Sequence, residues 1–254
     1  MSFDVAASAY DRFMGRFSEP LAVEFLAWAA DGGGVASPVL DVGCGPGALT
    51  TRLVESHGAA QVSAVDPSES FLQALRERLP GVDARAAAAE RLPFDDDVFG
   101  AAYAQLVVHF MADPVAGLAE MGRVVRPGGT VAACAWDFAA GGSPIGPFWL
   151  AAQDVDLTIP GESGRPGTRE GELARLATEA GLRAVVDGVV EVSVPMATFE
   201  DWWQPLTLGV GPAGDYVASL SPEERERLRD GCRARLPEAP FAVTGRAWAV
   251  RASV

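Results

Sequence analysis

A glycine-rich segment between a short apolar run and a helical pattern constrains the fold of this chain more than any other feature. Val39–Val42 is apolar apart from Asp41 and shows no alternation, which is typical of a strand buried on both faces of a sheet. Residues 43–47 (GCGPG) follow directly, and Leu49 and Leu53 then recur at helical spacing. Glycines let a backbone approach a ligand closely, and the N–H groups that open a helix point at it. This segment predicts an α/β sheet with a ligand at the turn.

The alternation of strand and helix continues along the chain. Further strands are predicted at residues 61–65, 82–86, 101–108, 130–135, 182–194 and 241–250. Together with Val39–Val42 they give seven strands, most of them separated by helices. The sequence therefore predicts an α/β fold with a doubly wound, mainly parallel seven-stranded sheet and a small helical lid inserted before the last strand.

Helix signals divide the chain further. Helices are expected to open near Ser18, Ser68 and Asp113, the first ending at the glycines of 31–34, and another is expected at 173–180. Residues 138–167, rich in Gly and Pro, are expected to form a loop. Two more helices are expected at 198–208 and from Ser221. We expect a single domain over 1–254, with an N-terminal helical cap at 1–30 and a lid at 195–240.

Two aspartates indicate the kind of ligand. Asp66 ends the second strand, where a carboxylate can accept hydrogen bonds from both hydroxyls of a ribose. The spacing of Gly43, Gly45 and Ala48 also fits a dinucleotide fingerprint. Spacing alone therefore does not distinguish a nicotinamide dinucleotide from S-adenosylmethionine. Asp41 would face a pyrophosphate unfavourably but suits the ammonium and sulfonium of S-adenosylmethionine. The charges favour this methyl donor; a glycine turn that only packs a helix on a sheet is the alternative.

Composition excludes several classes of function. The formal net charge is −14, so a nucleic-acid partner is not expected. The chain contains no lysine, which excludes lysine bases, Schiff bases and a P-loop lysine. Three scattered cysteines suggest neither a disulfide framework nor a metal site. Residues 1–4 show no targeting pattern and no apolar run is long enough to span a membrane, so we expect a cytoplasmic protein with no membrane partner.

The motifs together resemble those of the class I S-adenosylmethionine-dependent methyltransferases, in the branch that includes the menaquinone-biosynthesis methyltransferases. Residues 39–47 (VLDVGCGPG) match the first motif of that family and residues 64–68 (AVDPS) the second. Residues 90–94 (ERLPF) resemble the stretch that lies along the adenine, and residues 125–129 (VRPGG) the turn before the fifth strand. The resemblance covers about residues 8–136 by motif. It implies a Rossmann-like fold and methyl transfer from S-adenosyl-L-methionine, leaving S-adenosyl-L-homocysteine, to a small-molecule acceptor.

The resemblance also implies a set of cofactor-binding residues. They are Tyr10, Arg16, Asp41, Gly43, Cys44, Gly45, Gly47, Asp66, Pro67, Ser68, Ala89, Glu90 and Gln105. Tyr10 is expected at the methionine moiety and Arg16 at its carboxylate, although packing for Tyr10 and solvation for Arg16 are equally open. Ala88 stands where the family usually has an acidic residue, which leaves adenine contact to the backbone near Ala89 and to Glu90. Gly100 replaces the usual Asp at the start of the fourth strand.

Methyl transfer from a sulfonium is an in-line displacement that needs few catalytic residues. If the acceptor must lose a proton, a base is required, and His57 and His109 are the two histidines. His109 follows the fourth strand on the ligand-binding edge and is the better candidate, with a structural hydrogen bond as the alternative.

Aromatic residues in the second half suggest a pocket for an apolar or aromatic acceptor, unless most of them fill a cap core. They are Trp136, Phe138, Phe148, Trp149, Phe199, Trp202 and Trp203. Two other functions stay open: an NAD(P)-dependent oxidoreductase, or a protein of this fold that binds the cofactor without methyl transfer. The oligomeric state is not predicted.

Overall fold

One mixed sheet forms the centre of the computed structural model, which describes residues 7–30, 37–159 and 161–254. Its strands are β1 (Val39–Val42), β2 (Val62–Asp66), β3 (Asp83–Ala86), β4 (Phe99–Gln105), β5 (Val125–Trp136), β6 (Arg183–Met196) and β7 (Phe241–Ser253). Their order is β3-β2-β1-β4-β5-β7-β6. The first five strands are parallel, whereas β7 runs antiparallel to both β5 and β6. The predicted fold class is confirmed.

Helices cover both faces of the parallel strands. They are α1 (Ala7–Tyr10), the π-helical turn η1 (Asp11–Gly15), α2 (Arg16–Ala30), α3 (Ala48–His57), η2 (Ala59–Gln61), α4 (Glu69–Arg78), η3 (Val108–Phe110), α5 (Pro114–Val124) and α7 (Glu172–Glu179). Successive strand residues point to opposite faces. Val39 packs in the core of α2 and α3, while Leu40 packs in the core of α5 and α7. The absence of alternation in β1 therefore reflects burial on both sides.

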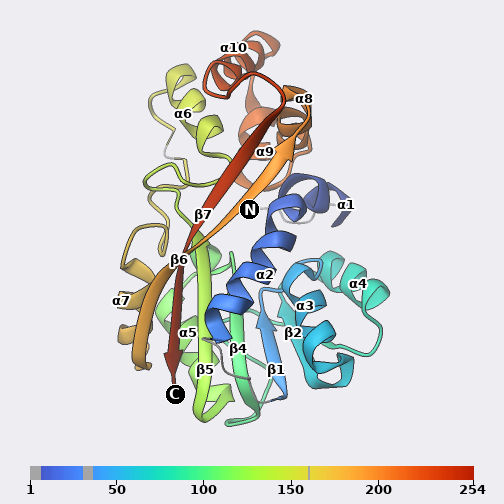
Figure 1. Cartoon of the computed structure of the whole chain (residues 1–254), viewed down its shortest axis with the longest axis vertical. Helices are drawn as coiled ribbons and strands as arrows, with labels where there is room; N and C mark the ends of the chain where they lie inside the picture. Colours follow the sequence, from blue (N-terminus) through green and yellow to red (C-terminus); the bar gives the residue numbers. More distant parts are fainter. Residues whose placement is uncertain (1–6, 31–36, 160) are drawn as a thin grey trace.

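A second body stands at the far end of the long β6–β7 ribbon (Figure 1). We call this body the cap, and it is distinct from the N-terminal helical cap predicted at residues 1–30. It contains α6 (Gly146–Val155), α8 (Phe199–Trp203), η4 (Gln204–Thr207), α9 (Gly211–Ser219) and α10 (Pro222–Arg233). Phe148, Trp202 and Leu228 are buried inside it. All of these elements except α6 lie between β6 and β7, where the lid was predicted. The division into an N-terminal cap and a lid with the boundaries given above stays a prediction.

Two helices of the cap contradict the sequence-based expectations. Helix α6 lies inside the predicted loop 138–167, and α9 was not expected. Both open with a glycine followed by a proline, a pair that usually indicates a turn, and both bury mostly small or aromatic residues. Helix α6 packs against α10, which lies about 70 residues further along the chain. Tertiary packing rather than an amphipathic period therefore stabilises it.

Several boundaries also differ by a few residues. Strand β4 runs over Phe99–Gln105, so Val108 lies in η3 instead of the strand. Helix α2 begins at Arg16 instead of Ser18, and β5 and β7 extend beyond the predicted ranges. The predicted helix end at 31–34 and the N-terminal residues 1–6 lie outside the described residues. Among the helices that are described, none combines the length and apolar character that crossing a membrane requires.

Candidate functional site

The glycine turn lies at the carboxyl end of β1, where the structure bends sharply toward α3. Gly43, Gly45 and Gly47 all have positive φ, at 71°, 52° and 102°. A Cβ at Gly43 would lie 2.3 Å from Cγ2 of Val107, whereas a Cβ at Gly45 would meet no atom within 4 Å. Gly43 therefore serves close packing, while Gly45 leaves open space beside the backbone.

Asp66 ties this turn to the next helix. Its Oδ2 accepts a hydrogen bond from the Gly45 N–H at 2.9 Å, and its Oδ1 accepts one from the Ser68 N–H at 2.8 Å. Ser68 caps α4, its Oγ accepting from the N–H of Phe71, and Pro67 is exposed between the two. A carboxylate has about four acceptor positions, so Asp66 keeps capacity for hydroxyl donors after these two bonds.

Asp41 and Gln105 each bring an unsatisfied acceptor to the same cavity, which has a volume of about 310 Å³. Thr50 Oγ1 donates to Oδ2 of Asp41 at 2.6 Å, and Nε2 of Gln105 donates to the carbonyl oxygen of Ser18 at 3.0 Å. Within the described residues, neither Oδ1 of Asp41 nor Oε1 of Gln105 has a hydrogen-bond partner. Buried acceptors are normally paired, so this arrangement fits a ligand that donates to both.

Burial dominates the electrostatics of Asp41. The side chain is 1% exposed, and desolvation raises its pKa to about 7 despite the hydrogen bonds from Thr50. Nearby Asp66 raises the same pKa further, because two carboxylates repel each other's charge. A cationic group placed against Oδ1 would relieve this penalty. The cavity is thus negatively polarised and suited to a positive ligand.

Six of the predicted cofactor residues line this one cavity. They are Tyr10, Asp41, Gly43, Cys44, Gly45 and Gln105. Tyr10 packs edge-on against Phe71 with ring centroids 5.2 Å apart, and burial raises the pKa of its hydroxyl. The N-terminal segment and the sheet edge therefore enclose the cavity from two sides.

Two other predicted residues, Arg16 and Gly47, have contacts outside the cavity that give each a structural role. The guanidinium of Arg16 donates to Sδ of Met196 at 3.3 Å and to the carbonyl oxygen of Asp201, so it joins the start of α2 to the cap. Gly47 lies at the N-terminus of α3, where a Cβ would be 3.3 Å from Cδ1 of Leu75.

The residues predicted at the adenine are not among those that line the cavity. Ala89 is buried in the core beneath α5. Oε1 of Glu90 accepts from the N–H of Ala112 at 2.7 Å and from that of Asp113 at 3.2 Å. Glu90 therefore braces the loop before α5 with one oxygen.

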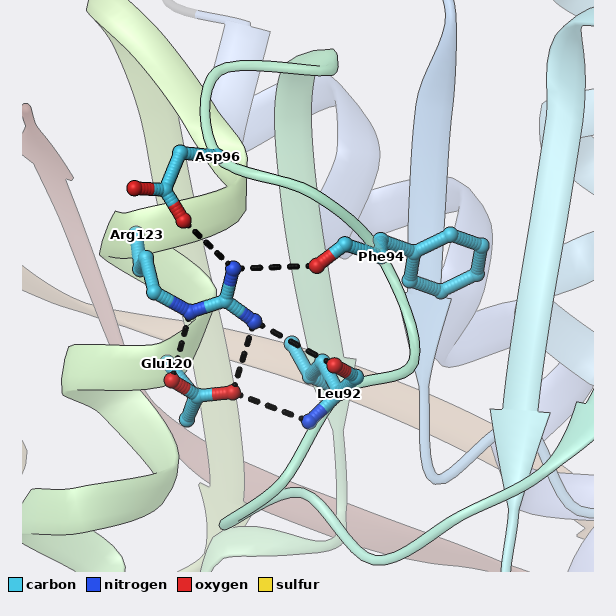
Figure 2. A network of polar contacts seen from close by, with 5 residues as sticks. All are labelled: Leu92, Phe94, Asp96, Glu120 and Arg123. Atoms are coloured by element: carbon cyan, nitrogen blue, oxygen red, sulfur yellow. Dashed lines mark hydrogen bonds and ion pairs between the residues drawn. The ribbon is translucent and has the colours of Figure 1, made fainter.

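A polar network fixes the segment that follows Glu90 (Figure 2). Arg123 of α5 donates to the carbonyl oxygens of Leu92 and Phe94, at 3.2 and 2.9 Å, and to Oδ1 of Asp96 at 2.7 Å. Glu120 pairs with the same guanidinium and accepts from the Leu92 N–H at 2.9 Å. One arginine thus organises the loop that the resemblance places along the adenine.

A second cavity, which we call the aromatic chamber, adjoins the first. Its volume is about 420 Å³, and Tyr10 and Leu106 line both cavities. Leu106 has a φ of 60°, a conformation that costs energy for a branched side chain and is concentrated at functional sites. The rings of Phe13, Phe110, Trp136 and Phe138 line the chamber. A flat apolar molecule would fit there.

His109 lies in the wall of the aromatic chamber. It is 3% exposed, and its Nδ1 has no hydrogen-bond partner in the part of the chain that the structure describes. Burial, and then the charge of Arg165, lower its pKa to about 3. His109 is therefore neutral at pH 7. The other histidine, His57, pairs through Nδ1 with Ser37 Oγ at 2.8 Å at the end of α3.

The predicted aromatic residues divide between the two bodies. Trp136 and Phe138 line the aromatic chamber. Most of the others are buried in the cap core, as the alternative interpretation held; these are Phe148, Phe199, Trp202 and Trp203. Trp149 donates through Nε1 to Glu162 at 3.0 Å.

Sequence reasoning missed three residues that shape the site. Thr50 holds Asp41 from the first turn of α3, a position that the helical spacing could have indicated. Arg123 organises the loop that the resemblance places along the adenine, and Glu162 lines the aromatic chamber. No local pattern marks these two, because an acid or arginine in such surroundings is usually solvated. Among the described residues, no three His, Cys, Asp or Glu side chains are grouped as a metal ion would require.

Comparison with known proteins extends this description. Residues 40–133 match the family model of a methyltransferase domain. An uncharacterized methyltransferase of Mycobacterium tuberculosis is 42% identical over 130 residues, which cover 51% of this chain and 49% of that protein. A demethylmenaquinone methyltransferase of Clavibacter sepedonicus is 35% identical over 140 residues, covering 52% of this chain and 55% of that protein. The chain spans about half the length of the curated relatives it matches.

The fold extends the likeness over most of the chain. The structure of a proposed methyltransferase from Bacillus halodurans superposes with a TM-score of 0.60 at 18% identity, over 91% of this chain and 97% of that one. Fold and site first define a doubly wound α/β domain with a ligand cavity at the carboxyl edge of its sheet. The sequence match over residues 40–133 makes this part of the chain similar to a methyltransferase domain, and the fold of the whole chain is that of a solved methyltransferase structure.

Proposed function

We propose that this chain transfers a methyl group from S-adenosylmethionine to a small-molecule acceptor. The donor would occupy the cavity at the glycine turn, and the acceptor the aromatic chamber next to it. The observation that carries the proposal is the pair of buried acceptors, Asp41 Oδ1 and Gln105 Oε1, beside the open backbone of Gly45. An ammonium group has three donors and a positive charge, so it satisfies both oxygens at once.

If the ammonium group is held by Asp41 and Gln105, the positions of the other parts of the donor follow. Asp66 faces the same turn with spare acceptor capacity, which suits the ribose hydroxyls. The loop held by Arg123 then lies on the adenine side, with contact through the backbone near Ala89 and through Glu90. Tyr10 lines both cavities, so it would stand beside the reacting sulfonium. When bound, the donor supplies an activated methyl carbon; the protein has to align the acceptor and exclude water.

A dinucleotide fits the same cavity less well. Its pyrophosphate carries negative charge, and it would approach Asp41 and Asp66, whose carboxylates already repel each other. The aromatic chamber is lined mainly by apolar side chains, which suits a small apolar or aromatic acceptor better than a polyanion.

Calorimetry with S-adenosylmethionine, S-adenosylhomocysteine and NADH tests the cofactor. We expect binding of the first two, with dissociation constants in the micromolar range typical of enzyme substrates, and no heat with NADH. Binding of NADH alone would contradict the proposal. Transfer of a labelled methyl group to a panel of small aromatic molecules then separates an enzyme from a protein that only binds the donor.

A further inference from the structure

A buried carboxyl group lines the aromatic chamber, and the proposed methyl transfer has so far given it no chemical role. Glu162 lies on the loop between α6 and α7 and is 3% exposed. It lines the chamber and also an outer groove of about 690 Å³ along α6, so it stands where the groove meets the chamber. An acceptor that enters by this groove passes its side chain.

The contacts of Glu162 hold its carboxyl group in place. Oε2 accepts a hydrogen bond from Nε1 of Trp149 at 3.0 Å, and Oε1 lies 3.7 Å from Nε of Arg165. Arg165 also stacks over the ring of Phe110, 4.9 Å from its centroid. A positive charge thus lies beside the carboxyl group in a wall that is otherwise mainly apolar.

Glu162 and His109 differ in their capacity to take a proton. Burial raises the pKa of Glu162 to about 7, against the lowering effects of Trp149 and Arg165. The pKa of His109 is about 3, so its neutral ring is a weak base. A general base works best when its pKa lies near the working pH. Arg165 lies beside Glu162 on the same loop, and the other titratable groups that line the chamber are His109 from η3 and Tyr10 from α1.

We propose that Glu162 is the general base of the methyl transfer, acting on a neutral planar acceptor that carries a phenolic or enolic hydroxyl. This inference rests on the proposed function. The hydroxyl proton moves to a carboxylate oxygen of Glu162, and the acceptor oxygen forms a bond to the methyl carbon. The carbon–sulfur bond breaks, and its electron pair stays on the sulfur, which becomes the neutral thioether. Atoms and charge balance without a further reactant.

The surroundings favour a hydroxyl over an amine. A protonated amine would have to lose its hydration among the rings of Phe13, Trp136 and Phe138, next to the guanidinium of Arg165. An oxygen that becomes negative during the reaction is instead stabilised by that guanidinium. A planar ring gains contact with the aromatic walls in either charge state.

The test uses the full chain with 1-naphthol, 2-naphthol and 2,7-dihydroxynaphthalene, which are neutral at pH 7, as hydroxyl acceptors and 1-naphthylmethylamine, which is protonated at pH 7, as the amine. Transfer of a labelled methyl group is measured from pH 5 to 9 for the wild type, Glu162→Gln and Glu179→Gln. Glu179 is a matched control on the exposed end of α7, paired with Arg175. We expect transfer to at least one hydroxyl, rising with pH through about 7, and a loss of 100-fold or more in kcat for Glu162→Gln alone.

Several results would overturn the inference: transfer to the amine but to no hydroxyl, transfer to none of the four, wild-type kcat in Glu162→Gln, or a pH profile without a break near 7. Calorimetry with S-adenosylhomocysteine keeps the two proposals apart, because retained binding with no transfer defeats only this inference. If Glu162→Gln fails to fold by circular dichroism, the pH profile and acceptor preference of the wild type still decide.

Discussion

The two cavities of this molecule are built in different ways. The cavity proposed for the cofactor is made largely by a short stretch of chain, since Asp41, Gly43 and Gly45 stand within five residues. Asp66, at the end of the next strand, accepts a hydrogen bond from the same turn. The aromatic chamber is assembled from distant segments, with Phe13, Trp136 and Ala213 among its walls. A site made by local backbone geometry can be predicted from the sequence, whereas a site assembled by packing of distant segments cannot.

Among the residues that position the backbone and loops, the largest effect is expected at Gly43, which packs closely at the glycine turn. Gly43→Ala places a Cβ 2.3 Å from Val107 and forces a side chain into a positive φ. We expect a loss of about 1–3 kcal/mol in the free energy of unfolding from overpacking. Affinity for S-adenosylhomocysteine should fall by roughly 100-fold, since small misplacements of positioning groups have effects of this size.

Gly58→Ala is the matched control, because Gly58 also has a positive φ but would meet no atom within 4 Å. Thermal unfolding and calorimetry on both variants separate steric contact from backbone strain. Equal losses in the two variants would show that the contact with Val107 does not shape the turn.

A smaller effect should follow from Arg123→Ala, which removes the donors that hold the adenine-side loop. We expect cofactor affinity to fall about tenfold, the equivalent of about one lost hydrogen bond to a charged group. Arg52→Ala, which breaks only an exposed pair with Glu55, should leave affinity unchanged. Calorimetry measures the cofactor affinity of both variants. If Arg123→Ala binds as tightly as the wild type, the loop that Arg123 holds is not part of the cofactor site.

The smallest effect concerns the contact between the two bodies. Arg16→Ala breaks the hydrogen bonds from α2 to Met196 and Asp201. We expect a loss of about 1 kcal/mol in the free energy of unfolding and at most a few-fold change in cofactor affinity. If Arg16 instead binds the carboxylate of the donor, Arg16→Ala will lower the affinity for the cofactor far more than the free energy of unfolding. Calorimetry measures the affinity and urea unfolding the stability, so together they distinguish the two roles of Arg16.

The difference between the regions also explains what the sequence predicts. The order of the elements, the glycine turn, and the cap that Ser68 provides for α4 follow from local patterns. Helix α6 does not, because its burial depends on α10, far away in the chain. Glu162 likewise appears as an ordinary loop acid until the fold places it beside Trp149 and the chamber.

Glu90 shows a further limit. Its position after β3 agrees with a role at the adenine, but one carboxylate oxygen is used by the backbone before α5. Sequence patterns identify which residues lie near an edge of the sheet, and the side-chain partners depend on the tertiary structure.

The central claim is that the carboxylate of Asp41 binds the ammonium group of the donor. Its pKa of about 7 lies above the ordinary value of 3.8, so without ligand its contribution to stability is lost as the pH rises from about 4 to 7. Without ligand, the buried carboxyl group of Asp41 prefers the neutral form. A cationic ligand reverses this preference, because it favours the ionised carboxylate. Affinity should therefore rise with pH until Asp41 is ionised.

Calorimetry with S-adenosylhomocysteine at pH 6 and pH 8 measures this directly. We predict about tenfold tighter binding at pH 8 in the wild type. In Asp41→Asn, binding should be weaker by about 2–5 kcal/mol, the cost of removing one partner of a buried charge pair. Its pH dependence should also be reduced to the contribution of Asp66, whose pKa is raised by burial too. Equal affinity at the two pH values in the wild type, or unchanged affinity in Asp41→Asn, would contradict the account.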